Sequence, residues 1–151
     1  MSVMLVLESK HYLVITPEQP HVSRGDGGHL IINPKVAVVD RTQLDRERAV
    51  DLMKLTMVAG EAMTTVLTRR GIDIGRINYQ DNGNWRPELH VHLYGRARGA
   101  TMQPFGHYLA LPLTAEAFRA QAPLQPLTAD DVAALREEMT RLLATEKFRA
   151  F

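Results

Sequence analysis

The sequence of 151 residues contains no cysteine. This absence excludes disulfides and thiolate metal sites, and it is typical of a cytosolic protein. No stretch approaches the roughly 18 consecutive apolar residues that a membrane-spanning helix requires, so we expect no membrane partner. The chain also lacks an excess of either charge, with 18 Lys and Arg against 17 Asp and Glu. Without a basic excess, a nucleic-acid partner is not expected.

Internal repeats and low-complexity tracts are absent as well, which argues against a solenoid or a disordered chain. Residues 3–7 form a short apolar run without a basic leader, so they favour a first strand over a signal peptide. Apolar residues make up 45% and charged residues 23% of the chain, as in ordinary globular proteins. We therefore expect one domain over residues 1–151 and a cytoplasmic location.

The order of the predicted elements indicates an α+β fold with a mostly antiparallel sheet. Strands are expected at residues 3–7, 11–16, 29–33, 76–80, 88–94 and 107–111, and residues 36–39 continue an extended path. Helices are expected at 45–70, at 114–120 and from Thr128 onward, where Thr128 and Asp131 have the spacing of a helix N-terminal cap. Strands in runs around one long central helix and one C-terminal helix do not follow an alternating βαβ order.

The most informative stretch alternates polar and apolar side chains. Glu88, His90 and His92 occupy every second position, with apolar residues between them. Successive side chains of a strand point to opposite faces, so these three would share one face. Two imidazoles and a carboxylate on a strand suit catalysis, metal binding or a satisfied polar network. Zinc accepts such ligands, but two histidines on one strand need help from His29 or His107 to complete a tetrahedron.

Several stretches resemble the histidine-triad (HIT) superfamily. Residues 88–96 resemble its His-φ-His-φ-His-φ-φ signature, where φ is apolar, with Glu88 in the first position and His90 and His92 in the second and third. Residues 28–35 are similar to the family's Gly-His-φ-φ-φ-x-Pro-Lys strand, and Leu44-Asp45 before a long helix is similar to its next element. Asn78 and Gly83-Asn84 correspond to an Asn and a Gly-Gln pair that precede the triad. The resemblance covers residues 5–96, with a core over 1–98 and a C-terminal extension over 99–151.

The resemblance implies a five-stranded antiparallel sheet, a homodimer and a nucleotide as the small-molecule partner, with no cofactor. It implies cleavage at the α-phosphorus of a dinucleoside polyphosphate, as in diadenosine polyphosphate hydrolases, or of a nucleoside phosphoramidate. His90 would attack phosphorus and form a nucleotidyl-histidine, which water then hydrolyses. A protonated His92 would neutralise phosphate oxygens, and Asn84 beside Gly83 would donate to the phosphate. The nucleoside pocket is expected at these side chains: His21, Asn33 and Asn78, with Leu13 and Ile31 flanking the base.

Glu88 leaves two further interpretations open. A carboxylate about 4 Å from a phosphate repels it by roughly 4 kcal/mol at an effective dielectric constant of about 20. Catalysis therefore requires Glu88 to be protonated, turned away, paired with Arg86, Arg96 or a metal, or used as a general acid. The alternatives are a nucleotide-binding protein without catalysis and a metal-binding protein that uses the His90/His92 pair. His29 is interpreted as a packing residue, and Trp85 as a pocket wall, a dimer contact or simple surface packing.

Overall fold

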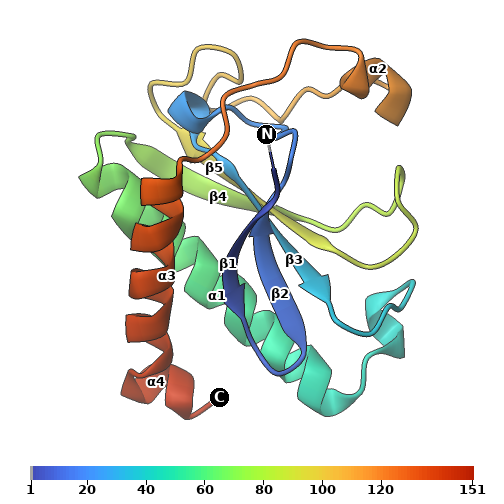
Figure 1. Ribbon diagram of the computed structural model, residues 1–151, viewed down its shortest axis with the longest axis vertical. Coiled ribbons are helices and arrows are strands. Elements are labelled where there is room, and N and C mark those ends of the chain that lie inside the picture. Colours follow the sequence, from blue (N-terminus) through green and yellow to red (C-terminus); the bar gives the residue numbers. More distant parts are fainter. Residues whose placement is uncertain (1) are drawn as a thin grey trace.

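A computed structural model describes residues 2–151 and contains one five-stranded antiparallel sheet with helices (Figure 1). The strands are β1 (Met4–Glu8), β2 (Tyr12–Thr16), β3 (His29–Pro34), β4 (Ile74–Gln80) and β5 (Val91–Ala97). Their order across the sheet is β1-β2-β3-β5-β4, and every neighbouring pair is antiparallel. The predicted α+β class is therefore confirmed.

The helices are α1 (Arg46–Arg69), α2 (Ala115–Arg119), α3 (Ala129–Leu143) and α4 (Glu146–Arg149), with short 3₁₀ turns η1 (Arg24–Asp26) and η2 (Arg41–Gln43). Figure 1 shows α1 and α3 side by side along one face of the sheet. No helix in residues 2–151 is both long and apolar enough to cross a membrane.

The sheet has one face toward the helices and one toward the site. Val14, Leu30, Ile32 and Leu93 are fully buried and belong to the hydrophobic core, where they pack with the apolar stripes of α1 and α3. Burying such a side chain stabilises the fold by about 2 kcal/mol. Because side chains alternate along a strand, the residues between these core positions point to the opposite face. That opposite face carries the polar groups described below.

The predicted helix ends are confirmed. The Asp45 side chain accepts a hydrogen bond from the backbone N–H of Arg48 at the start of α1. Gly71, which follows the last residues of α1, has φ of 92°, a conformation that glycine adopts at low cost. At α3, Thr128 and Asp131 form a complete capping box. Each cap satisfies backbone groups that the first or last helical turn leaves without a partner.

Three predicted strand assignments are wrong. β5 begins at Val91, so Glu88 precedes the strand and does not share its face with His92. Pro87 disfavours regular pairing there, and the backbone N–H of Leu89 instead bonds the carbonyl of Val38, at 2.7 Å. Residues 36–39 approach this segment through that bond but form no strand.

The third wrong assignment is the strand expected at 107–111, because the chain is irregular there. Two buried side chains hold this region by its backbone. The carboxylate of Asp26 accepts hydrogen bonds from the N–H groups of residues 101–103. The guanidinium of Arg96 donates to the carbonyls of Pro104 and His107. Within 107–111, the carbonyl of His107 accepts from Arg96, and the backbone of Ala110 bonds the side-chain amide of Gln103, so side chains supply partners that a neighbouring strand would otherwise provide.

Candidate active site

A cavity of about 270 Å³ opens on the face of the sheet that lies away from α1, at the start of β5. Its walls are His21, Ile31, Asn82, Gly83, Asn84, Trp85, Arg86, His90, His92, Tyr94 and Leu111. The cavity combines apolar walls with a few convergent polar groups, as small-molecule sites commonly do. Its volume lies at the small end of the range for such sites.

His90 is held in a single tautomer by the backbone. Its Nδ1 lies 2.7 Å from the carbonyl oxygen of Glu88, and a carbonyl only accepts, so Nδ1 carries the proton and donates. The lone pair of Nε2 is therefore free. Burial lowers the pKa of His90 below its ordinary value, which keeps this lone pair available near neutral pH. Such an imidazole has the properties of a nucleophile.

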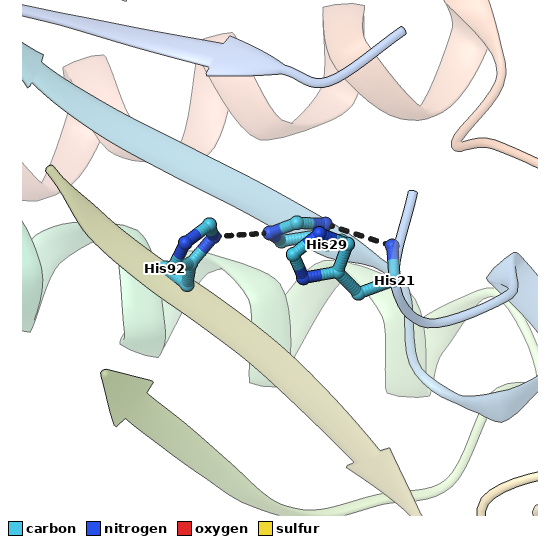
Figure 2. Close-up of side chains that lie close together, drawn as sticks. All are labelled: His21, His29 and His92. Carbon is cyan, nitrogen blue, oxygen red and sulfur yellow. Dashed lines mark hydrogen bonds between the residues drawn. The ribbon is translucent and has the colours of Figure 1, made fainter. Parts of the chain in front are cut away.

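His92 receives the opposite tautomer through a chain of hydrogen bonds (Figure 2). The backbone N–H of His21 donates to Nδ1 of His29 at 3.1 Å, so the proton of a neutral His29 must lie on Nε2. That Nε2 lies 2.9 Å from Nδ1 of His92 and donates to it. His92 consequently carries its own proton on Nε2.

The loop that supplies His21 approaches β5 closely where Gly27 and Gly28 lie against Gly95. The backbone N–H of Gly95 donates to the carbonyl of Gly28 at 3.0 Å. A Cβ on Gly95 would lie 1.9 Å from the carbonyl oxygen of Gly27, so only glycine permits this approach. Once in place, the His21 ring lies with Nδ1 2.8 Å from the hydroxyl of Tyr94.

Burial keeps the three imidazoles of Figure 2 neutral at pH 7. It lowers the pKa of His21 to about 4 and that of His92 to about 3, in each case mainly by desolvation. The pKa of His29, which is 1% exposed, is also lowered well below its ordinary value by burial. His92 is therefore a neutral N–H donor at pH 7 and not the protonated ring considered from the sequence.

The same three histidines are spaced as metal ligands are. One ring nitrogen from each of His21, His29 and His92 lies within 4.8 Å of the others. The hydrogen-bond order opposes this use, because Nδ1 of His29 accepts from a backbone N–H and its Nε2 holds a proton. A metal could bind Nε2 only by displacing that proton.

A family model for the HIT domain matches residues 3–99. The chain belongs to the HIT domain family. Solved structures agree with the fold. A histidine triad protein of Bradyrhizobium japonicum is 19% identical with a TM-score of 0.62, over 91% of this chain and 90% of that chain.

A histidine triad protein of Marinobacter aquaeolei is 20% identical with a TM-score of 0.62, over 93% of this chain and 88% of that one. A zinc-bound histidine triad family protein of Mycobacterium smegmatis is 18% identical with a TM-score of 0.61, over 94% and 87%. No curated protein matches the sequence.

The predicted site residues of this HIT domain fall into two groups. His21, Gly83, Asn84, His90 and His92 all line the cavity. Ile31, which was expected to flank the base, also lines it, whereas Leu13, Asn33, Asn78 and Glu88 do not. Asn33 accepts a hydrogen bond from Arg86 at 2.6 Å, and Asn78 accepts one from Arg96 at 2.8 Å. Asn33 thus positions Arg86, which lines the cavity, whereas Asn78 positions Arg96, which does not.

Glu88 also lies outside this cavity. Its side chain is exposed and borders a separate cavity of about 300 Å³, which reaches the other side of His90. Of the alternatives considered for its carboxylate, pairing with Arg86 or Arg96 is not observed, and these guanidinium groups bond Asn33 and Asn78. Glu88 reaches the site through its backbone carbonyl, which any residue at this position supplies.

Two features of the HIT domain site had no strong signal in the sequence. His29 is a central member of the hydrogen-bond chain, although a histidine at a strand start is more often a packing residue. Its register opposite Tyr94 on β5 places it on the cavity face, but that register requires the sheet. Leu111 and Phe118 come from the C-terminal extension, and only tertiary contacts bring them here.

Proposed function

We propose that the protein is a nucleotide hydrolase or nucleotidyl transferase that acts at the α-phosphate of a nucleoside phosphate. The substrate is a dinucleoside polyphosphate, as for diadenosine polyphosphate hydrolases, or a nucleoside phosphoramidate. The observation that carries this proposal is the pair of opposite tautomers in one cavity. His90 presents a lone pair, and His92, whose ring centroid is 4.6 Å away, presents an N–H.

The two rings supply complementary parts of a phosphoryl transfer. Nε2 of His90 forms a bond to the α-phosphorus while the bond from phosphorus to the leaving group breaks, and the leaving group takes the electron pair. The N–H of His92, with the Asn84 amide, donates to phosphate oxygens as charge develops. Water then attacks the nucleotidyl-histidine, releasing the nucleoside monophosphate and restoring His90. Such reactions depend chiefly on positioning and electrostatic stabilisation.

Mutation of His90 tests the proposal directly. His90→Ala should lower turnover of diadenosine polyphosphates and adenosine phosphoramidates by about a thousandfold or more, with nucleotide binding retained. Intact-mass spectrometry of the wild type during turnover should show one nucleotidyl adduct that the variant lacks. His107→Ala, which changes an exposed histidine, is the matched control. Unchanged turnover in His90→Ala would refute the proposal.

From the hydrogen-bond chain we predict that His29 positions the proton of His92. His29→Phe removes both the acceptor for the His21 N–H and the donor to His92, so the tautomer of His92 is no longer imposed. We expect kcat to fall by about tenfold to a hundredfold while the nucleotidyl adduct still forms. ¹⁵N chemical shifts of the His92 ring report the tautomer itself. A His92 ring that stays protonated on Nε2 in this variant would contradict the role assigned to His29.

The alternative function is nucleotide binding without catalysis, and it is favoured by a glutamate, Glu88, in the first triad position. Mutation of Glu88 distinguishes the two functions. If only the Glu88 carbonyl matters, Glu88→Ala keeps turnover within about threefold, because the backbone bond to His90 remains. If the wild type binds adenosine monophosphate saturably but forms neither product nor adduct, the binding-only function holds. A gain of turnover in Glu88→His would then identify the carboxylate as the cause.

Metal binding is a second candidate function, favoured by the spacing of His21, His29 and His92 and by the zinc-bound relative. Because a metal must displace the proton on His29 Nε2, zinc uptake should release a proton and strengthen as the pH rises. Calorimetry in buffers of different ionisation enthalpy measures that proton. Elemental analysis showing no metal after zinc loading and gel filtration would remove this candidate.

We also propose a homodimer formed along β4 and α1. β4 is an edge strand, and unpaired edges commonly pair with another chain. A largely apolar hollow of about 570 Å³ lies beside it, and its lining includes Met53 and Tyr79, which are 54% and 49% exposed. Met53→Lys should convert a dimer to a monomer in sedimentation equilibrium. A wild-type protein that sediments as a monomer at micromolar concentration would contradict the dimer.

A further inference from the structure

One wall of the site cavity is aromatic and comes from two distant parts of the chain. Trp85 is 36% exposed and lines the cavity, and it stacks on Phe118 of α2 with ring centroids 5.6 Å apart and planes at 29°. Phe118 itself is 7% exposed and also contacts the His21 ring edge-on, at 4.7 Å. Trp85 is therefore backed on one side by a buried ring and open on another.

The backing ring is firmly placed. The side chain of Thr114 caps α2, and the side-chain amide of Gln19 donates to the carbonyl of Phe118 at 3.3 Å. Gln19 lies in the same loop as His21, so α2 is attached to the loop that completes the hydrogen-bond chain. Residues 100–151 lie beyond the segment that the family model matches. The aromatic wall is thus built partly outside the matched HIT domain.

The His21 ring connects the aromatic wall to the proposed reacting groups. The Trp85 and His21 rings meet edge-on, with centroids 5.6 Å apart. The ring centroids of His21 and His92 are 5.1 Å apart. A planar group stacked on Trp85 would therefore be separated from a phosphate held by His92 by about the width of the His21 ring. Among the described residues that line this cavity, none is acidic, and Leu111 adds an apolar surface. The chemistry suits a flat, uncharged group attached to a phosphate.

We propose that Trp85, supported by Phe118, is a stacking platform for a planar group of the substrate and that it determines specificity. This inference rests on the proposed function for the identity of the phosphate-bearing ligand. The planar group is either the nucleobase or an aromatic leaving group. Both have the same recognition chemistry, because stacking on an aromatic side chain requires only a π-face.

Binding measurements in the His90→Ala background test the platform without depending on turnover. Calorimetry compares adenosine monophosphate with ribose 5-phosphate, which differ in the base. A second comparison uses adenosine N-benzyl and N-butyl phosphoramidates, which differ in the leaving group. Each ligand is titrated into His90→Ala alone and with Trp85→Leu, Trp85→Phe or Tyr108→Leu added. Tyr108 is the matched control, since it is aromatic, 94% exposed and outside the cavity.

Trp85→Leu should weaken the planar member of at least one comparison by about tenfold and leave its non-planar partner within about twofold. Trp85→Phe should keep most of the affinity, because it retains a π-face. A difference in the first comparison identifies the planar group as the base, and a difference in the second identifies it as the leaving group. If both members of each comparison weaken equally, or if no ligand changes, the inference is overturned. If the wild type shows no turnover but the planar preference holds, the proposed function fails and the platform stands.

Discussion

Lowering the pH from 7 to 5 should destabilise the protein through its buried histidines. An unfolded histidine titrates near pH 6.5, whereas burial lowers the pKa of His21 to about 4 and that of His92 to about 3 in the folded protein. Above pH 6.5 both rings are neutral in both states and contribute no pH dependence. Between about 6.5 and 4 the unfolded chain binds protons that the folded one does not, so stability falls as the pH falls.

The magnitude follows from the slope of linkage. Each such histidine changes the free energy of unfolding by about 1.4 kcal/mol per pH unit in this window. From pH 6.5 to 5 this gives about 2 kcal/mol for each of His21 and His92, or about 4 kcal/mol together. His29, whose pKa is also lowered by burial, acts in the same direction. Because domains of this size are stable by about 5–15 kcal/mol, the loss is readily measured.

Urea unfolding followed by far-ultraviolet circular dichroism at pH 7 and pH 5 provides the assay. His21→Phe removes one titrating ring while keeping an aromatic side chain, so the difference between the two pH values should shrink by about 2 kcal/mol. His107→Phe, at an exposed position, should leave the difference unchanged. A His21→Phe protein with the full wild-type pH dependence would refute the assignment of a partly buried, neutral His21.

Two further predictions concern the parts of the fold that hold the site. Gly95→Ala places a Cβ 1.9 Å from the carbonyl oxygen of Gly27, so urea unfolding should show a free energy of unfolding lowered by more than about 3 kcal/mol. Gly99→Ala is the control, since its Cβ meets nothing within 4 Å and should leave stability nearly unchanged. Asp131→Asn removes a fully buried carboxylate that pairs with Arg24 and Arg70 at 2.6 and 2.9 Å, so thermal unfolding should show a loss of about 3–5 kcal/mol. The exposed pair of Asp73 and Arg98 is the control, and Asp73→Asn should cost less than about 1 kcal/mol. Equal losses in either matched pair would contradict the packing described.

The polar and apolar alternation around His90 was sufficient to locate the site from the sequence, but the exact strand boundary was not. Alternation predicts a strand wherever it occurs, and it therefore included Glu88. Pro87 and the bond from Leu89 to Val38 shift the start of β5 to Val91. The assignment of Glu88 changed as a result, from a side chain on the same face as His92 to a backbone acceptor for His90. Tertiary pairing decided this, because it determines which residues find a ladder partner.

The sequence by itself determined the α+β class, the ends of α1 and α3, and the segment that carries His90 and His92. These features depend on side-chain periodicity and on local caps, which neighbouring residues specify. Only the tertiary structure decided which nitrogen of His92 carries its proton. That choice depends on the backbone N–H of His21, 71 positions earlier in the chain, acting through His29. No local pattern encodes it, because a tautomer follows from the hydrogen-bond partners that folding brings together.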